Sequence, residues 1–541
     1  MRTWIIEHKV ALLIAGILFY LYFRGIGDHG LIDNLEGVNA SIAAHMFGGE
    51  NYFVPKIGES LATGSTMGTW WLMALALKIF GWGEFAVRFW STLSGLGMIL
   101  ISALLVWPDS SDEDEDDEEE KEISKRRSWF AAATCGGMII CFVVSQIASS
   151  HAIFSFLTSL ALLGIIRAQS QEDKDWLIFS HAAIAFAFIT HGPAGLFMPI
   201  LAVSSYCVLC NDMELFKDFF TWPFGIITNL ILSGLYFSVL MVVNPQVIFF
   251  MLCRSYTYTF GGIIGAALFL FVSFAPFHGF LIQALIEIFP RRYPAEKSPE
   301  TFMLVWAMTF AAYAILSADI LAIAASVPAL SAILAIRLDY WLQGKMLPVR
   351  YAVLLNILIL VPAFFVVLPL TTKYFPVIQE SLLSLIPYEI TLALFLFACW
   401  YYTKTRQTRK WVRNVFLAAL ICLMPLAGVF NLTSNLYSIH EIGMKIRETV
   451  QGNDIVIQYG VNFPSVYFYT LRNSKLVNAP LNPGIEEKKF VEEVPYIAAQ
   501  WVRRNRIFLI IPSDSMSAAK LPNKNVLPLL SSNGNLLITN K

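Results

Sequence analysis

Long apolar runs, separated by short polar segments, make up most of this sequence. Many of them approach or exceed the length at which an α-helix crosses the hydrocarbon core of a bilayer. The pattern predicts an all-α polytopic membrane domain over residues 1–433, with about 13 transmembrane helices. The runs lie at about 10–24, 85–107, 128–147, 152–167, 176–190, 194–210, 220–242, 260–288, 302–316, 319–337, 350–370, 388–402 and 412–432.

Beyond residue 433 the long apolar runs stop and shorter, strand-like runs begin. Their length and β-branched content predict a small α/β domain over residues 434–541. It has no glycine-rich loop of the kind that binds nucleotides. The predicted strands are 454–459, 475–477 and 507–511, and the predicted helices are 463–471 and 490–503.

Clusters of Lys and Arg indicate how the chain is oriented in the membrane. If the N-terminus is cytoplasmic, the inner loops carry Lys125 to Arg127, Arg291 to Arg292, and the run from Lys404 to Lys410. Cytoplasmic loops are usually the ones rich in these residues. An odd number of spans then places the C-terminal domain outside the cell's inner (plasma) membrane.

An acidic run from Asp109 to Glu120 lies in the loop 108–127, which this topology places in the cytoplasm. Like charges at this density repel one another and provide nothing to bury in a core. The run therefore predicts a disordered segment. A tract that binds a partner or a cation is the alternative.

The composition is typical of a membrane protein and argues against one class of partner, nucleic acids. Charged residues make up 14% of the chain, whereas soluble proteins are roughly one quarter charged. Nearly all of the seven cysteines lie in or beside apolar runs, without disulfide or zinc spacing. We expect them to pack as small apolar side chains, and we expect no nucleic-acid partner.

The segment 24–84, called the outer segment below, is the most informative stretch. It should begin with a short helix along the membrane surface, from Asp33 to Met46. Val54-Pro55 follows, and then an apolar helix from Met67 to Phe80 that leads to Glu84-Phe85-Ala86-Val87-Arg88. Long ordered loops of this kind tend to carry function.

The order of these motifs resembles the GT-C membrane glycosyltransferases, in particular the aminoarabinose transferases and protein O-mannosyltransferases. The resemblance covers roughly residues 10–205 and implies the same fold. The matching residues are Glu36, Val54-Pro55, Trp71, Phe80-Gly81 and Glu84 to Arg88, and His191 to Leu196 is similar to the family's Lys-Gly-Pro-x-Gly-Leu.

The resemblance implies a glycosyltransferase that moves a sugar from a polyprenyl-phosphate carrier to a lipid, glycan or protein acceptor on the outer face of the membrane. Such chemistry needs a carboxylate base and cations that neutralise the departing phosphate. Its partners would be the lipid-linked sugar, an envelope acceptor and membrane lipids. The predicted catalytic residues are Glu36 and Asp33, and the predicted phosphate-binding residues are Lys56, Arg254, His151 and His191.

Several family positions hold other residues in this chain. One alternative is therefore a GT-C-like protein without catalysis that binds or presents a lipid-linked glycan. A transporter is a third, less favoured class. The departures are Leu35 for the family's catalytic Asp, Gly64-Ser65-Thr66 for Glu-Lys-Pro, His151 for an Asp, His191 for a Lys, and Asp319 to Ala322 for Lys-Leu-Pro-x-Tyr.

The candidate residues also have structural interpretations. Asp33 and Glu36 have the spacing of a capping box, which satisfies the first amides of a helix. Lys56 and Arg254 would then lie among lipid headgroups, and the two histidines would form hydrogen bonds at the membrane edge.

A divalent metal ion is left open as a cofactor, because His45, His151 and Glu36 could supply ligands. No residue is assigned to a metal site from the sequence.

Overall fold

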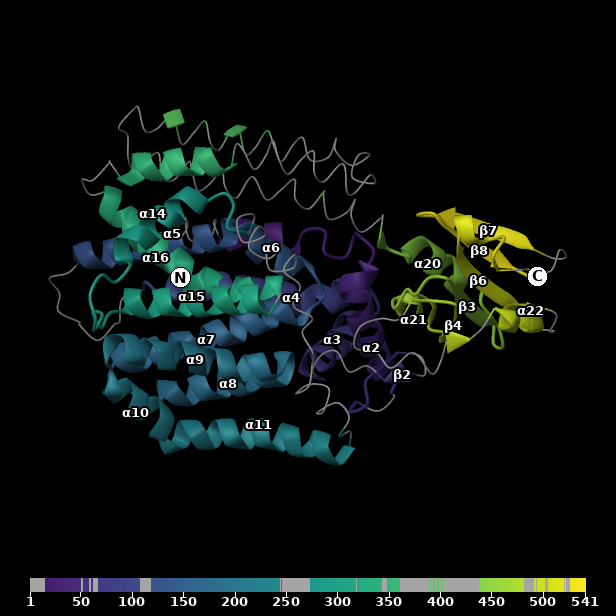
Figure 1. Ribbon diagram of the computed structural model, residues 1–541, viewed down its shortest axis with the longest axis horizontal. Helices are drawn as coiled ribbons and strands as arrows, with labels where there is room; N and C mark the ends of the chain where they lie inside the picture. Colours follow the sequence, from purple (N-terminus) through teal and green to yellow (C-terminus); the bar gives the residue numbers. More distant parts are fainter. Residues whose placement is uncertain are drawn as a thin grey trace, which may run out of the picture.

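The computed structural model shows two parts arranged along one axis (Figure 1): a bundle of long helices, and a smaller domain with a sheet and the C-terminus. Helices α2 (Val38–Phe47) and α3 (Met67–Phe80) of the outer segment lie between them. The described residues are 15–49, 52–57, 60–61, 67–107, 118–243, 273–317, 319–342, 348–360, 437–480, 491–492, 494–501, 505–519 and 526–541, with a few isolated positions between them.

Within these residues, six helices are long and apolar enough to cross a membrane. They are α4 (Glu84–Leu104), α7 (Ser150–Ser170), α9 (Pro193–Cys210), α11 (Pro223–Val243), α15 (Pro299–Leu316), and the 3-10 helix η2 (Ile320–Ser326) continued by α16 (Val327–Leu342). A seventh span results if α5 (Glu118–Gly137) and α6 (Ile139–Gln146), which meet at a 59° bend, are counted as one. Shorter helices are α8 (Trp176–His191), α10 (Met213–Thr221) and α14 (His278–Ile288).

The predicted multi-span helical domain is confirmed. The apolar runs predicted at 85–107, 152–167, 194–210 and 302–316 are α4, α7, α9 and α15. The runs at 388–402 and 412–432 lie outside the described residues except for isolated positions, and those beginning at 10, 260 and 350 are described only in part. The acidic run also lies outside them, apart from its last three residues, which begin α5.

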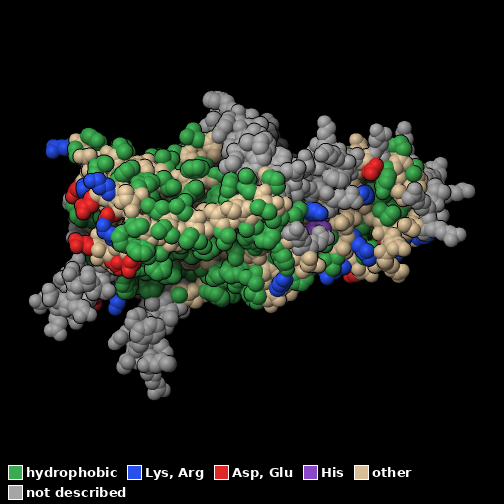
Figure 2. Space-filling view, turned by 90° about the horizontal axis from the view of Figure 1, so that it is seen from below, with side chains coloured by type: hydrophobic (Ala, Val, Ile, Leu, Met, Phe, Trp, Pro, Cys, Tyr) green, Lys and Arg blue, Asp and Glu red, His purple; other side chains and the backbone are tan. Residues whose placement is uncertain are grey.

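Burial separates the central helices of the bundle from the peripheral ones. We compared the most apolar stretch of 18 residues in each helix. In η2 and α16, 78% of this stretch is buried, and in α7 72% is buried, but in α11 only 11% is buried. The exposed face of α11 carries Leu230, Leu235 and Val242. Such a surface fits the hydrocarbon core of a membrane. Figure 2 shows hydrophobic side chains around the bundle and charged ones gathered at its end away from the sheet.

The C-terminal part holds a mixed sheet of six strands, flanked by α20 (His440–Thr449), α21 (Val466–Thr470) and α22 (Pro495–Trp501). The strands, in spatial order, are β5 (Val491–Glu492), β4 (Ser474–Val477), β3 (Ile455–Tyr459), β6 (Ile507–Pro512), β8 (Asn535–Thr539) and β7 (Leu527–Ser532). The first four are parallel, whereas β8 pairs antiparallel with both β6 and β7.

The predicted α/β character of this part is confirmed, and β3, β4 and β6 match the three predicted strands. The β7–β8 hairpin and α20 were not predicted. The hairpin turns at Asn533 and Gly534, whose φ angles are 52° and 72°. An Asn-Gly pair between two apolar runs is the strongest short-range sign of such a hairpin, and it is present in the sequence.

The outer segment packs against the C-terminal domain through an apolar cluster that includes Trp70, Leu77 and Ile442. Hydrogen bonds cross the same junction. The indole N–H of Trp82 donates to the Phe468 carbonyl oxygen at 2.9 Å, and the Leu31 N–H donates to the Tyr469 hydroxyl at 2.7 Å. The junction therefore holds the outer segment between the bundle and the sheet.

Candidate functional site

Glu36 lies in η1 (Asp33–Gly37), a turn of π-helix that runs directly into α2. Its side chain is fully buried and forms a two-pronged ion pair with Arg88 of α4, with both N–O distances at 2.7 Å. The backbone N–H groups of Ile32 and Ala148 donate to the same two oxygens at 2.9 and 2.8 Å. Four donors therefore surround this carboxylate.

These contacts determine the charge state of Glu36. Burial alone would raise the pKa of its carboxyl group, but the charge and hydrogen bonds of Arg88, together with two backbone amides, lower it. The group is ionised, and its acceptor positions are occupied. This geometry favours a positioning role, in which Glu36 ties the outer segment to α4. Its predicted catalytic role stays a prediction.

Asp33 is also buried, but it faces the C-terminal domain. Its Oδ1 accepts a hydrogen bond from the Ser465 N–H at 3.0 Å, and it makes no capping bond in η1. The predicted capping box is therefore not formed: Asp33 does not cap the helix, and Glu36 accepts from the Ile32 N–H, one residue before the predicted N-cap. Burial raises the pKa of Asp33 to about 7, against the opposing effect of hydrogen bonds with Ser465.

Asp33 should make the stability of this junction depend on pH. Its folded-state pKa of about 7 lies above the ordinary 3.8, so the folded protein binds this proton more tightly than the unfolded chain does. The free energy of unfolding that this proton contributes is fully present below the ordinary pKa of 3.8. It is lost as the pH rises through the folded-state pKa of about 7. We expect the wild-type unfolding midpoint to fall, relative to Asp33→Asn, between about pH 4 and pH 7.

Thermal unfolding of both proteins, followed by intrinsic fluorescence across this pH range, measures the effect. Asn stays neutral, so the difference between the two midpoints isolates Asp33 from other titrating groups. Parallel pH curves for the two proteins would contradict the assignment.

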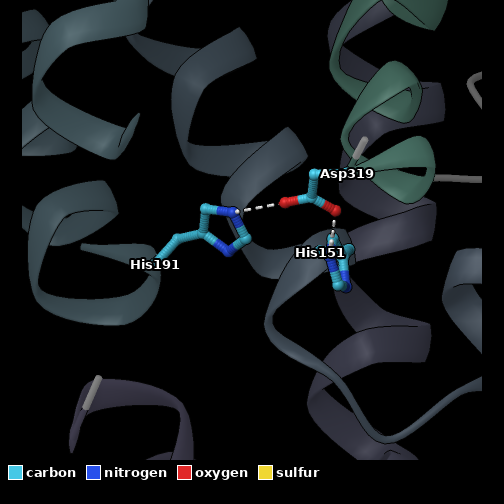
Figure 3. A group of neighbouring side chains, drawn as sticks. All are labelled: His151, His191 and Asp319. Carbon is cyan, nitrogen blue, oxygen red and sulfur yellow. Dashed lines mark hydrogen bonds and ion pairs between the residues drawn. The ribbon is translucent and has the colours of Figure 1, made fainter. Parts of the chain in front are cut away.

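Three polar side chains from distant parts of the chain meet at the end of the bundle nearest the outer segment. His151 lies in the first turn of α7, His191 is the last residue of α8, and Asp319 directly precedes η2. Figure 3 shows both imidazole rings beside the Asp319 carboxylate, one at each oxygen. The Nε2 of His151 lies 2.8 Å from Oδ1, and the Nε2 of His191 lies 3.5 Å from Oδ2. These three residues are called the His-Asp-His cluster below.

The carboxylate of the cluster is ionised, and the cluster is partly exposed. Burial would raise the pKa of Asp319, but the charge and hydrogen bond of His151, with a hydrogen bond from His191, lower it well below its ordinary value. The exposed fraction is 21% for the His151 side chain, 18% for Asp319 and 8% for His191. The Asp319 carboxylate is therefore ionised and paired with the two imidazoles, and part of the cluster is exposed.

An apolar groove with a volume of about 990 Å³ lies between α9 and α15. Its lining on α15 extends from Leu304 to Ser317, which is about 20 Å of helix. At one end, Ser317 Oγ accepts a hydrogen bond from the Asp319 N–H at 3.3 Å. Arg291 and Arg292 line the other end. The groove thus runs along α15 and ends at Ser317, two residues before Asp319, while none of the three cluster side chains lines it.

The structure places the other predicted site residues elsewhere. Lys56 is exposed in β1 (Lys56–Ile57), which pairs with β2 (Ser60–Leu61). Arg254 lies outside the described residues. His45 stacks on Tyr467 of the C-terminal domain, with 3.5 Å between ring centroids.

The structure also bears on the choice of metal ligands. Among the residues that it describes, the one group of three with ligand atoms within 4.8 Å of one another is the His-Asp-His cluster. His151 is therefore grouped with His191 and Asp319, and neither His45 nor Glu36 belongs to the group.

Comparison with protein families finds no family model that matches this chain. An uncharacterised protein of Aquifex aeolicus is 24% identical over 238 residues, which are 44% of this chain and 45% of that protein. The match thus spans less than half the length of that relative.

Solved structures give a match over nearly the whole chain. ArnT from Cupriavidus metallidurans, crystallised with undecaprenyl phosphate, aligns with a TM-score of 0.78 at 16% identity, over 99% of this chain and 98% of ArnT. This chain has the fold of ArnT. The apo form of ArnT aligns with a TM-score of 0.73 at 15% identity, over 100% of this chain and 98% of ArnT. ArnT is a GT-C aminoarabinose transferase, so the likeness predicted from the outer-segment motifs is confirmed for the fold.

Within the ArnT fold, the sequence motifs located two members of the cluster and missed the third. His151 and His191 were predicted from their places in family motifs. Asp319 was noted as a departure from a family pattern, and no partner was assigned to it. A sign was available, because an Asp between two apolar runs at a membrane edge needs a partner or a function.

Proposed function

We propose that this protein is a glycosyltransferase that moves a sugar from a polyprenyl-phosphate carrier to an acceptor at the outer face of the membrane. The observation that carries the proposal is the whole-chain likeness to ArnT crystallised with undecaprenyl phosphate. We place the protein in the inner (plasma) membrane, with residues 434–541 on the extracytoplasmic side, because of the basic inner loops.

The groove supports this proposal, because it suits the hydrocarbon chain of such a carrier. Its lining is largely apolar, with Leu201 on α9 and Leu304 and Met308 on α15. A chain packed along it would bring the carrier's phosphate to Ser317 and the His-Asp-His cluster. Imidazole N–H groups at that point can donate hydrogen bonds to phosphate oxygens.

In the proposed reaction an acceptor oxygen bonds to the anomeric carbon of the sugar, and the bond from that carbon to the phosphate oxygen breaks. The acceptor's proton passes to a carboxylate, and the departing polyprenyl phosphate takes the electron pair. Asp319 is an ionised, accessible carboxylate beside the proposed phosphate position. The predicted catalytic roles of Glu36 and Asp33 remain part of the proposal, although their burial favours positioning.

The test is release of undecaprenyl phosphate by the full chain in lipid nanodiscs, supplied with a panel of undecaprenyl-phosphate-linked sugars and envelope extracts as acceptors. This readout does not require the sugar to be known in advance. We expect at least one member of the panel to be consumed. Failure with every member, in protein that binds undecaprenyl phosphate, would support the non-catalytic alternative.

A groove-filling variant tests where the lipid lies. Ala312→Trp places a large ring in the groove, and we expect it to slow release at least about tenfold, because displaced substrates lose alignment. Leu230→Trp, on the exposed face of α11, is the matched control and should leave release unchanged. Equal rates for both variants would place the lipid elsewhere.

One observation favours the non-catalytic alternative. Leu35, which stands where the family has its catalytic Asp, is 49% exposed and carries no group that can transfer a proton. A protein of this kind would bind undecaprenyl phosphate and release none from its sugar-linked forms.

A further inference from the structure

The His-Asp-His cluster has the donor atoms of a metal site. Two imidazole nitrogens and a carboxylate oxygen lie within 4.8 Å of one another. Ligand atoms bound tetrahedrally to zinc lie roughly 3.3–3.6 Å apart, given metal–ligand bonds of about 2.0–2.2 Å. The His191–Asp319 N–O separation of 3.5 Å falls in that range, and the His151–Asp319 separation of 2.8 Å is shorter. Rotation of these side chains can therefore bring the N–O separations to the spacing that a bound ion needs.

The second nitrogen of each ring is held in the way that metal-binding histidines require. The His191 Nδ1 lies 2.8 Å from Ser150 Oγ, and the His151 Nδ1 lies 3.2 Å from Ser149 Oγ. When a metal binds, each serine hydroxyl can accept from Nδ1–H, while Nε2 gives up the proton that it shares with Asp319 and turns its lone pair to the ion. Phe154 stacks on the His191 ring, at 4.2 Å between centroids, and so fixes its plane.

Both histidine rings are oriented by serines that belong to one short stretch of the chain. Ser149 and Ser150 immediately precede His151, so one short stretch at the start of α7 supplies a ligand and the hydroxyl groups that orient both rings. An interfacial histidine whose only task is a hydrogen bond does not need such support on its other nitrogen. This arrangement favours a built site over a chance meeting of polar groups.

We propose that His151, His191 and Asp319 bind one divalent first-row transition-metal ion of the zinc class, with a coordination position left open. Two imidazoles and one carboxylate suit such ions better than they suit magnesium or calcium, which prefer oxygen ligands. Three protein ligands with an open position are typical of sites that act on a substrate rather than of closed structural sites.

The open position gives the ion a role at the lipid phosphate, and this role rests on the proposed function. In the resembling family a Lys stands at the position of His191 and supplies positive charge. A neutral imidazole supplies none, but two imidazoles and a carboxylate around a divalent ion leave a net charge of +1. That charge lies next to Ser317, at the groove end where the phosphate is proposed to sit.

Binding of zinc to the purified full-length protein in detergent tests the site without any sugar or lipid. After the metal is stripped with EDTA, zinc is added back and the excess is removed by dialysis, we expect one zinc ion per wild-type chain by elemental analysis. Cobalt should give the visible absorption of a tetrahedral ion, and magnesium should not compete. The double variant His151→Ala/His191→Ala should lose the ion.

Two further variants keep the test decisive. Ser150→Ala removes only a supporting hydroxyl and should weaken zinc binding by about 10- to 100-fold. His440→Ala is the control, because it breaks a similar contact between His440 and the Glu84 carboxylate at 2.8 Å. Within the described residues, this pair belongs to no group of three possible ligands, so the variant should keep the ion.

Equal zinc binding by wild type and the double variant would overturn the proposal, as would unchanged affinity in Ser150→Ala. Loss of zinc binding would not touch the transferase proposal, which release of undecaprenyl phosphate tests separately. Zinc binding without release would leave the metal site standing and remove its role at a transferred phosphate.

Discussion

Replacing Glu36 by Gln should destabilise the folded protein by about 3 to 5 kcal/mol, the usual cost of breaking one side of a buried ion pair. The substitution keeps the size of the side chain but leaves the guanidinium of Arg88 fully buried without its counter-charge. It also weakens the acceptors that satisfy the Ile32 and Ala148 amides. The outer segment should therefore loosen from α4, which lowers the unfolding midpoint and the yield of monodisperse protein.

Two other variants show whether the loss of stability comes from the buried ion pair. Glu36→Gln combined with Arg88→Met removes both charges and should recover much of the lost stability, because apolar replacement of a buried pair is often close to neutral. Glu84→Gln alters a half-exposed pair with His440 and should cost about 1 kcal/mol or less. A Glu36→Gln protein that unfolds at the wild-type temperature, yet releases undecaprenyl phosphate roughly a hundredfold more slowly, would instead make Glu36 a catalytic base.

The pairing of Glu36 with Arg88 was only partly predictable from the sequence. Both residues were recognised in outer-segment motifs, and the expected surface helix is present. Their contact could not be deduced, because it depends on how η1 packs against α4 and not on spacing along one helix. A physical sign existed, since a buried Glu and a buried Arg in apolar surroundings each need an opposite charge.

The bundle was the most predictable part of the molecule. Apolar runs such as 194–210 and 302–316 are long enough to leave little choice of structure in a membrane, and they became α9 and α15. The bend between Gly137 and Ile139 was not predicted, although the pair Gly136-Gly137 lies directly before it and such pairs are common sites of helix kinks.

The His-Asp-His cluster was predictable only in part. Sequence separation hides it, because Asp319 follows His151 by 168 positions. Only the packing of η2 beside α7 brings the carboxylate between the two rings, one in the first turn of α7 and the other at the end of α8. Family positions could suggest that each histidine replaces a charged group, but not that a nearby Asp changes what the two can do together.

Replacing His191 by Ala should slow release of undecaprenyl phosphate by about 10²- to 10³-fold, the usual cost of removing one group that stabilises charge on a leaving oxygen. This expectation rests on the proposed function. It applies whether the ring acts directly on the phosphate or through a bound metal ion. His181→Gln, ten residues earlier on the same helix, is the matched control. The His181 Nε2 contacts the Phe219 carbonyl oxygen at 3.2 Å, about 15 Å along α8 from the cluster, so release should be unchanged.

His191→Lys separates the two ways in which the ring could act. A lysine ammonium at this position supplies the positive charge found in the resembling family, but it cannot bind a metal while protonated. If an ion bound by the cluster holds the phosphate, wild-type release should stop in EDTA and return with zinc, whereas His191→Lys should retain release in EDTA. If the imidazoles act directly, EDTA should leave the wild type unaffected. Loss of release in His191→Lys at wild-type stability, with or without zinc, would show that charge at this position is not what the reaction requires.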